Sequence, residues 1–450
     1  MSEWKRYKLS DIASLSNGIN FDKSAYTSGV KLIGVADFKD RIYPDYNSLQ
    51  EVDYKVVRKG DYLEKGDIVF VRSNGNKELV GRCMMIDQDI PVTYSGFCIK
   101  LRLMDKNIFE PIFFNYLFRT RQFRKAMTGT AVGANIQNLS QSRLGNCEVC
   151  VPNIEEQREI ATILSRYDSL IENYQKQIKL LEEAAQRLYK EWFVDLHFPG
   201  HENTKIVDGV PEGWEKKMVG DIVKIKSGYA FKSKDWQSTG CPVVKIKDIT
   251  GTFVNSGLLD CVTFDIASKA KQYLLNSGDL VIAMTGATIG KIGIIVDNGL
   301  YTNQRVGKFF LNEEDLPFIY CFFKQESSLK QIIQLSSASS AQPNISGAQL
   351  ESLSFVYNEE LYDKYNLECI SLFKQMISLQ SQIRLLTEAR DRLLPKLMSG
   401  EIAVDGGRPE RPLSCQPNGN ALGMEMETNN RPVGATNCQP NGNALGINER

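Results

Sequence analysis

A glycine-containing stretch that follows an apolar run carries the residue types of a phosphate-binding loop. It reads Gly286-Ala-Thr-Ile-Gly290-Lys291-Ile292. A P-loop needs four residues between its glycines, so that backbone amides wrap the phosphates, and Ser or Thr after the lysine to reach magnesium. Here three residues separate the glycines and isoleucine follows the lysine. The spacing therefore predicts a turn between two strands rather than a nucleotide site.

Other residues of catalytic type also lack the pattern that their chemistry needs. Asp208 with Glu215-Lys-Lys217 has the outline of a nuclease site, but such triplets are common by chance. The chain contains no Pro-Pro, which the Asn-Pro-Pro-aromatic type of loop in adenine methyltransferases requires. Cys147 and Cys150 form a lone CxxC, and with only two histidines in the chain, buried thiols are favoured over a zinc site. We predict no catalytic residue, no metal and no cofactor bound by this chain.

One segment combines basic and aromatic residues without any acid. Residues 111–147 contain no Asp or Glu, and aromatic side chains are interleaved with basic ones. The basic residues are Arg119, Arg121, Arg124, Lys125 and Arg143. The formal net charge of the chain is zero, which argues against a general nucleic-acid coat. The segment is therefore either a solvated basic helix face or a surface that lies along a phosphate backbone.

These residues belong to a chain that repeats itself. The stretch QIKLLEEAAQRLYKEW, residues 177–192, recurs 205 residues later as QIRLLTEARDRLLPKL, with eight of sixteen positions identical. Shorter matches precede it: Asn17-Gly18 answers to Ser227-Gly228, and Gly66-Asp67 to Gly278-Asp279. Each repeat therefore comprises a globular part of about 150 residues and a long helix.

The globular parts are predicted to be mixed α/β domains. DIVFVRSNG, GDLVIAMTG and KIGIIV are short Val- and Ile-rich runs bounded by turn residues, which is typical of strands. PIFFNYLFRTRQFRKAM and LPFIYCFFKQESSLKQII each predict a helix that closes the domain. We therefore predict an α+β fold in which two globular mixed α/β domains are separated by two long helices. The predicted boundaries are 1–152 for the first domain, 153–200 for the first helix, 201–357 for the second domain, 358–400 for the second helix and 401–450 for a disordered repeat tail.

The two long helices carry apolar residues at heptad spacing. The first has an Asn153 cap with Glu156 three residues later, and Pro199-Gly200 ends it. Only Arg390 is out of character in the second helix. The predicted coiled-coil interface consists of Leu164, Ile171, Tyr174, Ile178, Leu181, Leu188, Leu372, Met376, Leu379, Ile383, Leu386 and Leu393. The alternative is that each helix lies on a domain core, although that burial usually takes a wider apolar face.

Chain geometry sets the direction of the predicted helix pair. About 40 helical residues span about 60 Å, and the linker 195–213 also reaches only about 60 Å when fully stretched. An antiparallel return is therefore easier than a parallel one. The sequence predicts a rod with one globular domain at each end, related by an approximate two-fold axis.

The bulk composition is that of an ordinary globular protein. Hydrophobic residues make up 42% of the chain and charged residues 24%. The start lacks the apolar core of a signal peptide, and no apolar run approaches the length that spans a bilayer. Ten cysteines without regular spacing fit a reducing compartment. We expect a cytoplasmic protein with no membrane partner.

Together these motifs resemble the specificity subunit of type I restriction-modification enzymes, over residues 1–402. The signature combines Pro-x-x-x-Glu-Gln at Pro152–Gln157 with Glu191-Trp-Phe-Val-Asp195, then VPEGW and LLPKLMSGEI. The second half departs from it, with FVYNEELYDKYN where Pro and Glu-Gln are expected. The resemblance therefore implies docking of a partner subunit less directly at that end.

The resemblance implies a non-catalytic role in DNA recognition. Two target-recognition domains would each read half of an asymmetric bipartite site on double-stranded DNA. The helices would hold them apart and bind two modification (methyltransferase) subunits and, for cleavage, restriction subunits. S-adenosylmethionine, ATP and Mg would then belong to those partners. The alternative is a coiled-coil adaptor that joins two protein-binding β domains without DNA.

Candidate DNA contacts are the polar and basic residues near loops, because such side chains read base edges and hold phosphates. Solvated surface residues and turn formers are the alternative for each of them. The candidates of the first domain are Arg72, Asn74, Lys77, Arg82, Tyr94 and Ser95, with Arg121, Arg124 and Lys125 from the basic segment. Those of the second domain are Thr285, Thr288, Lys291, Asn303, Gln304 and Arg305, with Lys245 and Lys247 as phosphate contacts.

The tail repeats one motif. CQPNGNALG occurs at Cys415–Gly423 and again at Cys438–Gly446, and the polar, Pro- and Gly-rich composition predicts disorder. The 23-residue period favours a duplicated coding segment over a module that binds a partner.

Overall fold

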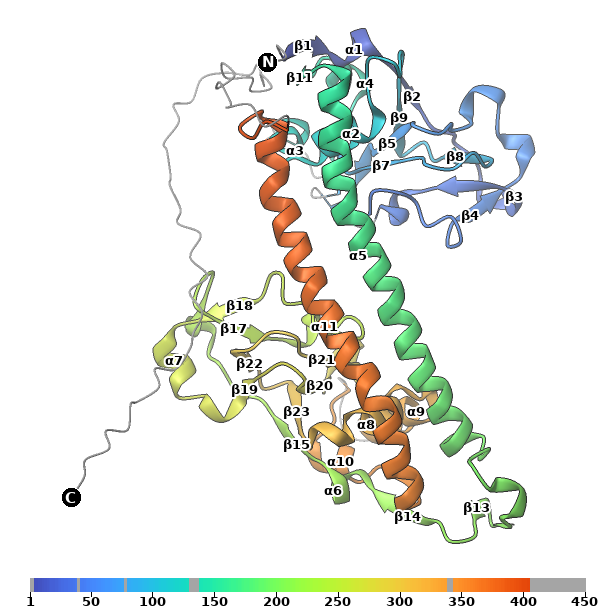
Figure 1. Ribbon diagram of the computed structural model, residues 1–450, viewed down its shortest axis with the longest axis vertical. Coiled ribbons are helices and arrows are strands. Elements are labelled where there is room, and N and C mark those ends of the chain that lie inside the picture. Colours follow the sequence, from blue (N-terminus) through green and yellow to red (C-terminus); the bar gives the residue numbers. More distant parts are fainter. Residues whose placement is uncertain (1–3, 39–40, 77–78, 129–136, 338–342, 405–450) are drawn as a thin grey trace, which may run out of the picture. The chain divides into compact units, whose positions relative to one another are not determined.

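The computed structural model describes residues 4–38, 41–76, 79–128, 137–337 and 343–404. Within these residues the chain divides into two compact units, one that runs up to residue 171 and includes residues 386–404, and one that comprises residues 172–385. We name them unit 1 and unit 2 and describe each by itself. Each unit holds one globular repeat and a segment of both long helices (Figure 1). Residues 405–450 of the predicted tail lie outside the described residues, and the five predicted domain boundaries stay a proposal.

The first long helix begins with the predicted cap, and the second begins with an asparagine cap that was not predicted. Helix α5, Ile154–Tyr189, is preceded by Asn153, whose Oδ1 accepts a hydrogen bond from the Glu156 amide at 2.8 Å. Helix α11, Glu359–Met398, follows Asn358, which caps the Leu361 amide at 3.1 Å. A π-helical turn, Lys190–Val194, ends the first helix sooner than predicted, because Leu196 adopts a left-handed backbone (φ 58°) that the helix cannot continue through.

Unit 1 is built on a four-stranded antiparallel sheet in the order β2-β9-β5-β7, beside a three-stranded sheet in the order β4-β3-β8. The strands are β1 Lys5–Lys8, β2 Ala13–Asn17, β3 Tyr26–Ile33, β4 Gln50–Val52, β5 Ile68–Val71, β6 Ser73–Asn74, β7 Cys83–Met85, β8 Val92–Tyr94, β9 Cys98–Leu103, β10 Gln137–Asn138 and β11 Glu148–Val151. The short helices are α1 Leu9–Ile12, α2 Pro111–Arg119, α3 Arg121–Thr128 and α4 Gln141–Gly145. Strand β1 pairs with β11, so the chain enters and leaves the globular part side by side.

Unit 2 repeats this topology. Its four-stranded sheet has the order β15-β23-β20-β21, and β16-β18-β17-β22-β19 contains the equivalent of the smaller sheet. The strands are β12 Ile206–Val207, β13 Val210–Pro211, β14 Glu215–Met218, β15 Lys224–Ser227, β16 Trp236–Gln237, β17 Cys241–Val244, β18 Asp260–Val262, β19 Leu274–Leu275, β20 Leu280–Ala283, β21 Ile292–Ile294, β22 Leu300–Thr302, β23 Val306–Phe310 and β24 Ser354–Tyr357. The helices are α6 Val219–Ile222, α7 Phe264–Ser268, α8 Leu316–Lys324, α9 Glu326–Ser337 and α10 Gly347–Glu351. Strand β14 pairs with β24 as β1 does with β11.

Each predicted closing helix is in fact two helices. In unit 1 the break falls at Thr120, which has an extended backbone (ψ 143°). Its hydroxyl accepts a hydrogen bond from the Phe123 amide at 3.3 Å and so begins α3. In unit 2 the break falls at Gln325, between α8 and α9. A threonine that caps a helix was read in the sequence as an interior residue.

The two long helices run antiparallel and lie side by side within each unit (Figure 1). In unit 1, Leu164 of α5 shares one apolar core with Leu397 near the end of α11. In unit 2, the Tyr365 hydroxyl near the start of α11 donates to the Ala185 carbonyl of α5 at 3.0 Å. All twelve predicted interface residues are buried or half-buried. The predicted antiparallel pair is confirmed, while the predicted rod stays a prediction.

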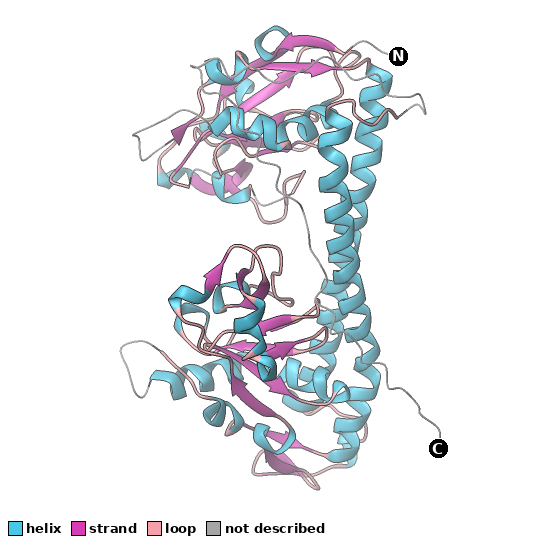
Figure 2. Cartoon of the chain, turned by 90° about the vertical axis from the view of Figure 1, so that its left-hand side faces the viewer, coloured by secondary structure: helices cyan, strands magenta, loops and turns pink. Residues whose placement is uncertain are grey.

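The same helix segments also support the globular cores. In unit 2, Tyr189, Phe193 and Tyr365 pack with Phe318 of α8, and Figure 2 shows the sheets of each unit on one side of its helix segments. Pairing with a partner helix and burial against a domain core, which the sequence set against each other, therefore occur together. None of the described helices is both long and apolar enough to cross a bilayer.

A buried ion pair interrupts the apolar seam in unit 1. Arg390 of α11 pairs with Asp168 of α5, and their side chains are only 16% and 18% exposed. The Tyr116 hydroxyl of α2 donates to the same carboxylate. At the equivalent places in unit 2 stand Ala185 and Phe373, both fully buried in the apolar core. The out-of-character arginine of the heptad pattern therefore has its partner on the other helix.

The glutamine of the Pro-x-x-x-Glu-Gln signature fastens α5 to the globular part. The Gln157 side chain is buried; its Oε1 accepts from the Glu110 amide at 2.9 Å and its Nε2 donates to the Ile108 carbonyl at 3.0 Å. In the second half, where the signature is lost, Asn366 Oδ1 accepts from the Phe318 amide at 3.0 Å. Gln157 thus attaches α5 to the segment just before α2, and Asn366 attaches α11 to the first turn of α8.

Replacing Gln157 by alanine is expected to lower the free energy of unfolding by about 2 kcal/mol, because the Glu110 amide and the Ile108 and Pro152 carbonyls lose their hydrogen-bond partner. Hydrogen exchange of the full chain, read at residues 108–110 and 154–160, measures the loss. The matched control is Gln177→Ala on the same helix, whose half-buried side chain donates to Asn173 at 2.8 Å. Equal effects of the two substitutions would contradict this role of Gln157.

Candidate nucleic-acid interface

Three loop segments of unit 1 converge on one surface. The segment after β5 meets the turn between β8 and β9, since the Arg72 amide donates to the Phe97 carbonyl at 2.8 Å. The Leu139 amide, just after β10, donates to the Arg72 carbonyl at 2.8 Å. The Arg72 guanidinium itself donates to the Gly96 carbonyl at 3.3 Å. The two loops that the sequence singled out in this domain therefore do meet.

Unit 2 builds the same surface with other side chains. The Met284 amide donates to the Arg305 carbonyl at 3.0 Å, and the Ile345 amide donates to the Met284 carbonyl at 3.0 Å. The Thr285 hydroxyl donates to the Pro343 carbonyl at 2.9 Å. Met284 thus occupies the place of Arg72, and Arg305 the place of Phe97.

Two glycines of the sequence repeat hold the β8–β9 and β22–β23 turns close to the end of β2 and β15. A Cβ at Gly18 would lie 2.2 Å from the Tyr94 carbonyl oxygen, and one at Gly228 would lie 2.4 Å from that of Asn303. No side chain fits in that space. The backbone frame of the surface is therefore tight in both units.

Most candidates of the first domain lie on or beside this surface. Arg72, Asn74, Arg82 and Ser95 are half-buried. The Asn74 Oδ1 is occupied, since it accepts from the Asn76 amide at 2.8 Å. Lys77 lies outside the described residues.

Tyr94 is a core residue. Its side chain is fully buried, and its hydroxyl lies 2.7 Å from Ser16 Oγ. Burial raises the pKa of Tyr94 to about 12, so the hydroxyl stays protonated at neutral pH. Because β8 is buried on both faces, a polar aromatic residue there points inward, and we remove Tyr94 from the candidate contacts.

Part of the basic segment, Arg121–Thr128, forms α3, which lies against the loop that follows β6. A Cβ at Gly81 would sit 3.2 Å from Cβ of Met127, the last turn of this helix. Arg121 and Lys125 are exposed and Arg124 is half-buried. Arg119 is different, because its guanidinium donates to the Cys83 carbonyl at 3.2 Å and so braces the fold. The acid-free segment is thus partly structural and partly a basic face beside the candidate surface.

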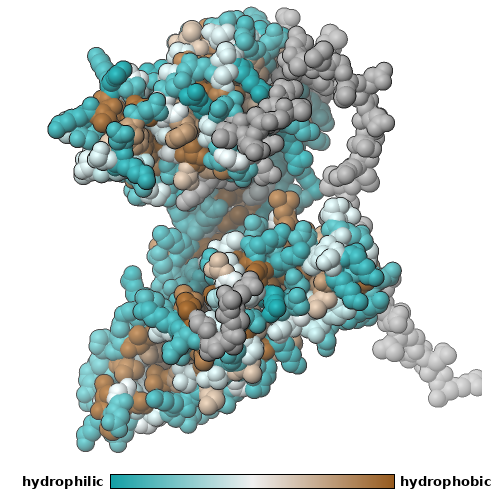
Figure 3. All heavy atoms as spheres, turned by 180° about the vertical axis from the view of Figure 1, so that it is seen from behind, coloured by the Kyte–Doolittle hydropathy of each residue, from teal (hydrophilic) through white to brown (hydrophobic). Residues whose placement is uncertain are grey.

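In unit 2 the corresponding helix is not basic. Helix α9 carries Glu326, paired with Lys330 at 2.7 Å, and the exposed apolar residues Leu329 and Ile333. Figure 3 shows polar residues over most of each unit, with smaller apolar patches. The two units therefore differ in charge where their backbones agree.

The two proposed phosphate contacts of unit 2 already share a carboxylate. Lys245 and Lys247 each lie 2.9 Å from Asp260, and the Lys245 ammonium sits 3.3 Å from the centre of the Trp236 ring. Hydrogen bonds from Lys245 and then Lys247 hold the pKa of the Asp260 carboxyl below its usual range. Phosphate would have to compete with Asp260 for both lysines, which weakens them as candidates.

The remaining candidates of unit 2 flank the surface. Gly286–Thr288 form a 3-10 turn between the antiparallel strands β20 and β21, which confirms the predicted turn. Lys291 and Gln304 are exposed, and Thr285, Thr288 and Asn303 are half-buried. Asn303 Oδ1 accepts from the Gln304 amide at 2.8 Å. Gln304 and Arg305 are therefore exposed donors of the turn between β22 and β23, and Lys291 is an exposed donor at the end of the turn between β20 and β21.

Sequence reasoning missed two residues of this surface. Phe97 was not considered because it is apolar, yet its side chain is 61% exposed. Asn344 lies in the third segment, and its Oδ1 accepts from Arg305 Nη1 at 3.2 Å. Aligning YSGF of the first repeat with TNQR of the second would have placed Phe97 and Arg305 at equivalent positions.

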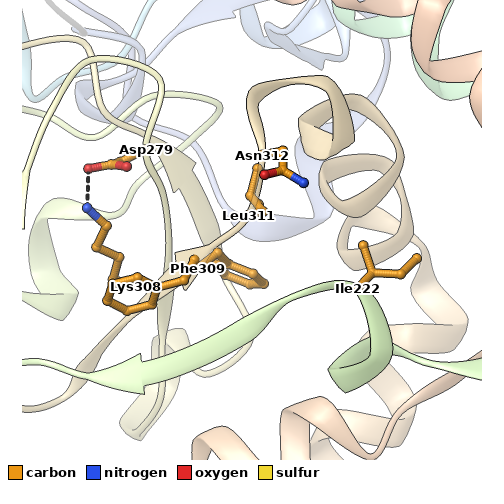
Figure 4. Close-up of a pocket in the computed structure, with 7 residues that line it drawn as sticks. Ile222, Asp279, Lys308, Phe309, Leu311 and Asn312 are labelled. Atoms are coloured by element: carbon orange, nitrogen blue, oxygen red, sulfur yellow. Dashed lines mark hydrogen bonds and ion pairs between the residues drawn. The ribbon is translucent and has the colours of Figure 1, made fainter.

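A shallow pocket elsewhere in unit 2 does not add a ligand site. It is lined by Ile222, Phe309, Leu311 and Asn312 together with Asp279 and Lys308 (Figure 4). The Lys308 ammonium lies 2.6 Å from the Asp279 carboxylate and 3.0 Å from the Leu274 carbonyl, so the two charges satisfy each other. Among the described residues, no three His, Cys, Asp or Glu side chains gather as a metal site would need. Burial raises the pKa of the Cys147 thiol to about 11, which opposes metal binding.

The fold defines a class of protein with two units of the same topology. Each unit carries a surface formed by three loop segments, and backbone hydrogen bonds at equivalent positions join these segments in both units. Residues 1–183 and 211–371 match the family model described as type I restriction modification DNA specificity domain. The chain belongs to this family.

Known relatives agree with this assignment. The chain is 30% identical over 302 residues to the type I restriction enzyme MjaIX specificity subunit of Methanocaldococcus jannaschii, covering 64% of this chain and 68% of that protein. It is 23% identical over 476 residues to the HindI specificity subunit of Haemophilus influenzae, covering 89% and 100%. A solved S subunit from M. genitalium has a similar fold, with a TM-score of 0.56 and 19% identity over 88% of this chain and 96% of that one. The resemblance inferred from the sequence, and the prediction of a specificity subunit rather than a catalytic one, are confirmed.

Proposed function

We propose that unit 1 and unit 2 each read one half of an asymmetric, split site on double-stranded DNA, as the recognition subunit of a type I restriction-modification enzyme. One observation carries this proposal: the same three-segment frame is present twice, with Arg72 and Phe97 in one unit and Met284 and Arg305 in the other. A common frame with different side chains suits two readers of different sequences. An adaptor that joins two proteins would have no need for a basic helix such as α3 beside one surface.

The long helices are proposed to set the distance between the two half-sites and to bind two modification subunits, with restriction subunits added for cleavage. Their pairing within each unit, through Tyr365 and Ala185 in one case and Leu164 and Leu397 in the other, supports a stiff spacer. The chemistry of methyl transfer and cleavage, with S-adenosylmethionine, ATP and Mg, belongs to those partners. The complex would act on DNA in the cytoplasm.

The proposal is tested by expressing the full chain with a type I modification (methyltransferase) subunit from the same genome. Methylated adenines are then mapped across the host genome, and the purified complex is assayed for binding to duplexes that carry the mapped site. We expect a motif of two short, different blocks separated by a fixed number of unread base pairs. Methylation without a motif, or a single undivided motif, would overturn the proposal.

Replacing Arg72 by alanine is expected to weaken binding by about 1 to 3 kcal/mol at sites with the correct unit 1 half, if its guanidinium reads a base. Duplexes altered only in the unit 1 half-site should show a smaller effect, since they have already lost the contact. The matched control is Arg6→Ala, which removes a half-exposed arginine of the same unit that pairs with Glu148. An equal loss on all duplexes would make Arg72 a phosphate contact.

A further inference from the structure

We propose that the position held by Phe97 in unit 1 and by Arg305 in unit 2 decides which base pair each unit selects there. Phe97 would favour an A·T pair through the thymine methyl group, and Arg305 a G·C pair through the guanine edge. This inference rests on the proposed function and names the residue of each surface that carries the selection.

The two residues occupy one place in the backbone frame. The Cys98 amide donates to the Ser95 carbonyl at 2.8 Å, and the Val306 amide donates to the Asn303 carbonyl at 2.8 Å. The carbonyls of Phe97 and Arg305 accept from the residue that follows β5 and β20, respectively. The corner of both surfaces thus has one backbone and two unlike side chains.

Phe97 is held outward by a rigid turn. Its amide donates to Ser95 Oγ at 3.3 Å, and its carbonyl accepts from both Arg72 and Ser73. The neighbouring Gly96 packs closely against the segment after β2, since a Cβ there would lie 2.1 Å from Asn20 Oδ1 and 3.2 Å from the Ile19 carbonyl oxygen. An exposed ring in such a turn does not belong to the core, and it has no hydrogen-bonding group to read a base edge. Apolar contact with the thymine methyl is the base-specific interaction that it can make in the major groove.

Arg305 is exposed and partly positioned. One guanidinium nitrogen, Nη1, is fixed by Asn344 Oδ1 at 3.2 Å. This bond orients the guanidinium but leaves its other N–H groups without a partner in that bond. Two of them can donate together to guanine O6 and N7. Asn344 is therefore a positioning residue. A planar fork and an apolar ring cannot favour the same base pair.

The test exchanges the two side chains in the complete complex. Phe97→Arg and Arg305→Phe are each expressed with the methyltransferase, and the selected motif is read from mapped adenines and from binding to duplexes with every base at each half-site position. We expect Phe97→Arg to change one position of the unit 1 half-site from A·T to G·C, by about tenfold or more, with the unit 2 half-site unchanged. Arg305→Phe should do the converse. Asn344→Ala should keep the preference for G·C and weaken it.

The control Tyr54→Arg adds the same charge to unit 1 at another exposed aromatic residue, which is 64% exposed and lies outside the three segments. In each variant, normal recognition of the half-site read by the unsubstituted unit shows that the complex is folded. If the wild-type complex selects a split motif but both exchanges leave it unaltered, or change affinity equally for all sequences, this inference fails while the proposed function stands. If the wild-type complex selects no motif, both fail.

Discussion

Replacing Arg390 by alanine is expected to lower the free energy of unfolding of unit 1 by about 3 kcal/mol, because Asp168 is left as a buried charge without its partner. The carboxylate would keep only the hydrogen bond from the Tyr116 hydroxyl. Hydrogen exchange of the full chain should therefore rise in residues 154–171 and 386–398 far more than in unit 2. Urea unfolding followed by the same method measures the magnitude.

A control on the same helix separates burial from charge. Arg392 pairs with Glu388 one turn away, with both side chains well exposed, so Arg392→Ala should cost less than about 0.5 kcal/mol. The double variant Asp168→Phe with Arg390→Ala copies the apolar residues that unit 2 has at these places, and should recover part of the loss. Equal destabilisation by Arg390→Ala and Arg392→Ala would show that the buried pair has no special role.

Adding one heptad to each long helix is expected to move the two DNA half-sites about three base pairs apart. Seven helical residues add about 10 Å, and each base pair rises about 3.4 Å. Suitable points are after Ile171 in α5 and before Leu386 in α11, where the chain divides between the two units. The original site should lose most of its methylation, and mapped adenines should reveal the same two blocks with a longer gap.

The matching control inserts a heptad into α5 alone. The apolar residues of the two helices would then be out of register over part of their length, so we expect loss of folding rather than a new gap. A motif with an unaltered gap in the doubly inserted protein would mean that the helices do not set the distance.

The repeat, the helix pair and its direction could be predicted because each depends on local or periodic signals. Asn153 followed by Glu156 is a local signal for a helix start, and heptad spacing from Leu164 onward favours an apolar partner. Gly18 and Gly228 were visible as matched positions, although their reason, a close approach of another turn, was not. Patterns that act over one or two turns survive folding unchanged.

The site residues were predicted less well because their roles depend on contacts distant in the sequence. Tyr94 has the residue type of a DNA contact, but a hydroxyl partner at Ser16 keeps it in the core. In the sequence Lys245 and Lys247 have no evident partner, but in the structure both pair with the Asp260 carboxylate. Phe97 was missed for the opposite reason, since an apolar residue was assumed to be buried and the tight turn holds it outside.

The pairing of β1 with β11, and of β14 with β24, has a consequence for how such a protein changes. Lys5 faces Val151 and Glu215 faces Tyr357, so the first and last strands of each globular part lie side by side. A related segment that keeps these strands and the core contacts to α5 and α11 can replace the part between them, because the ends to be rejoined stay in place. Recombination between related genes could therefore replace one globular part at a time and leave the two long helices unchanged.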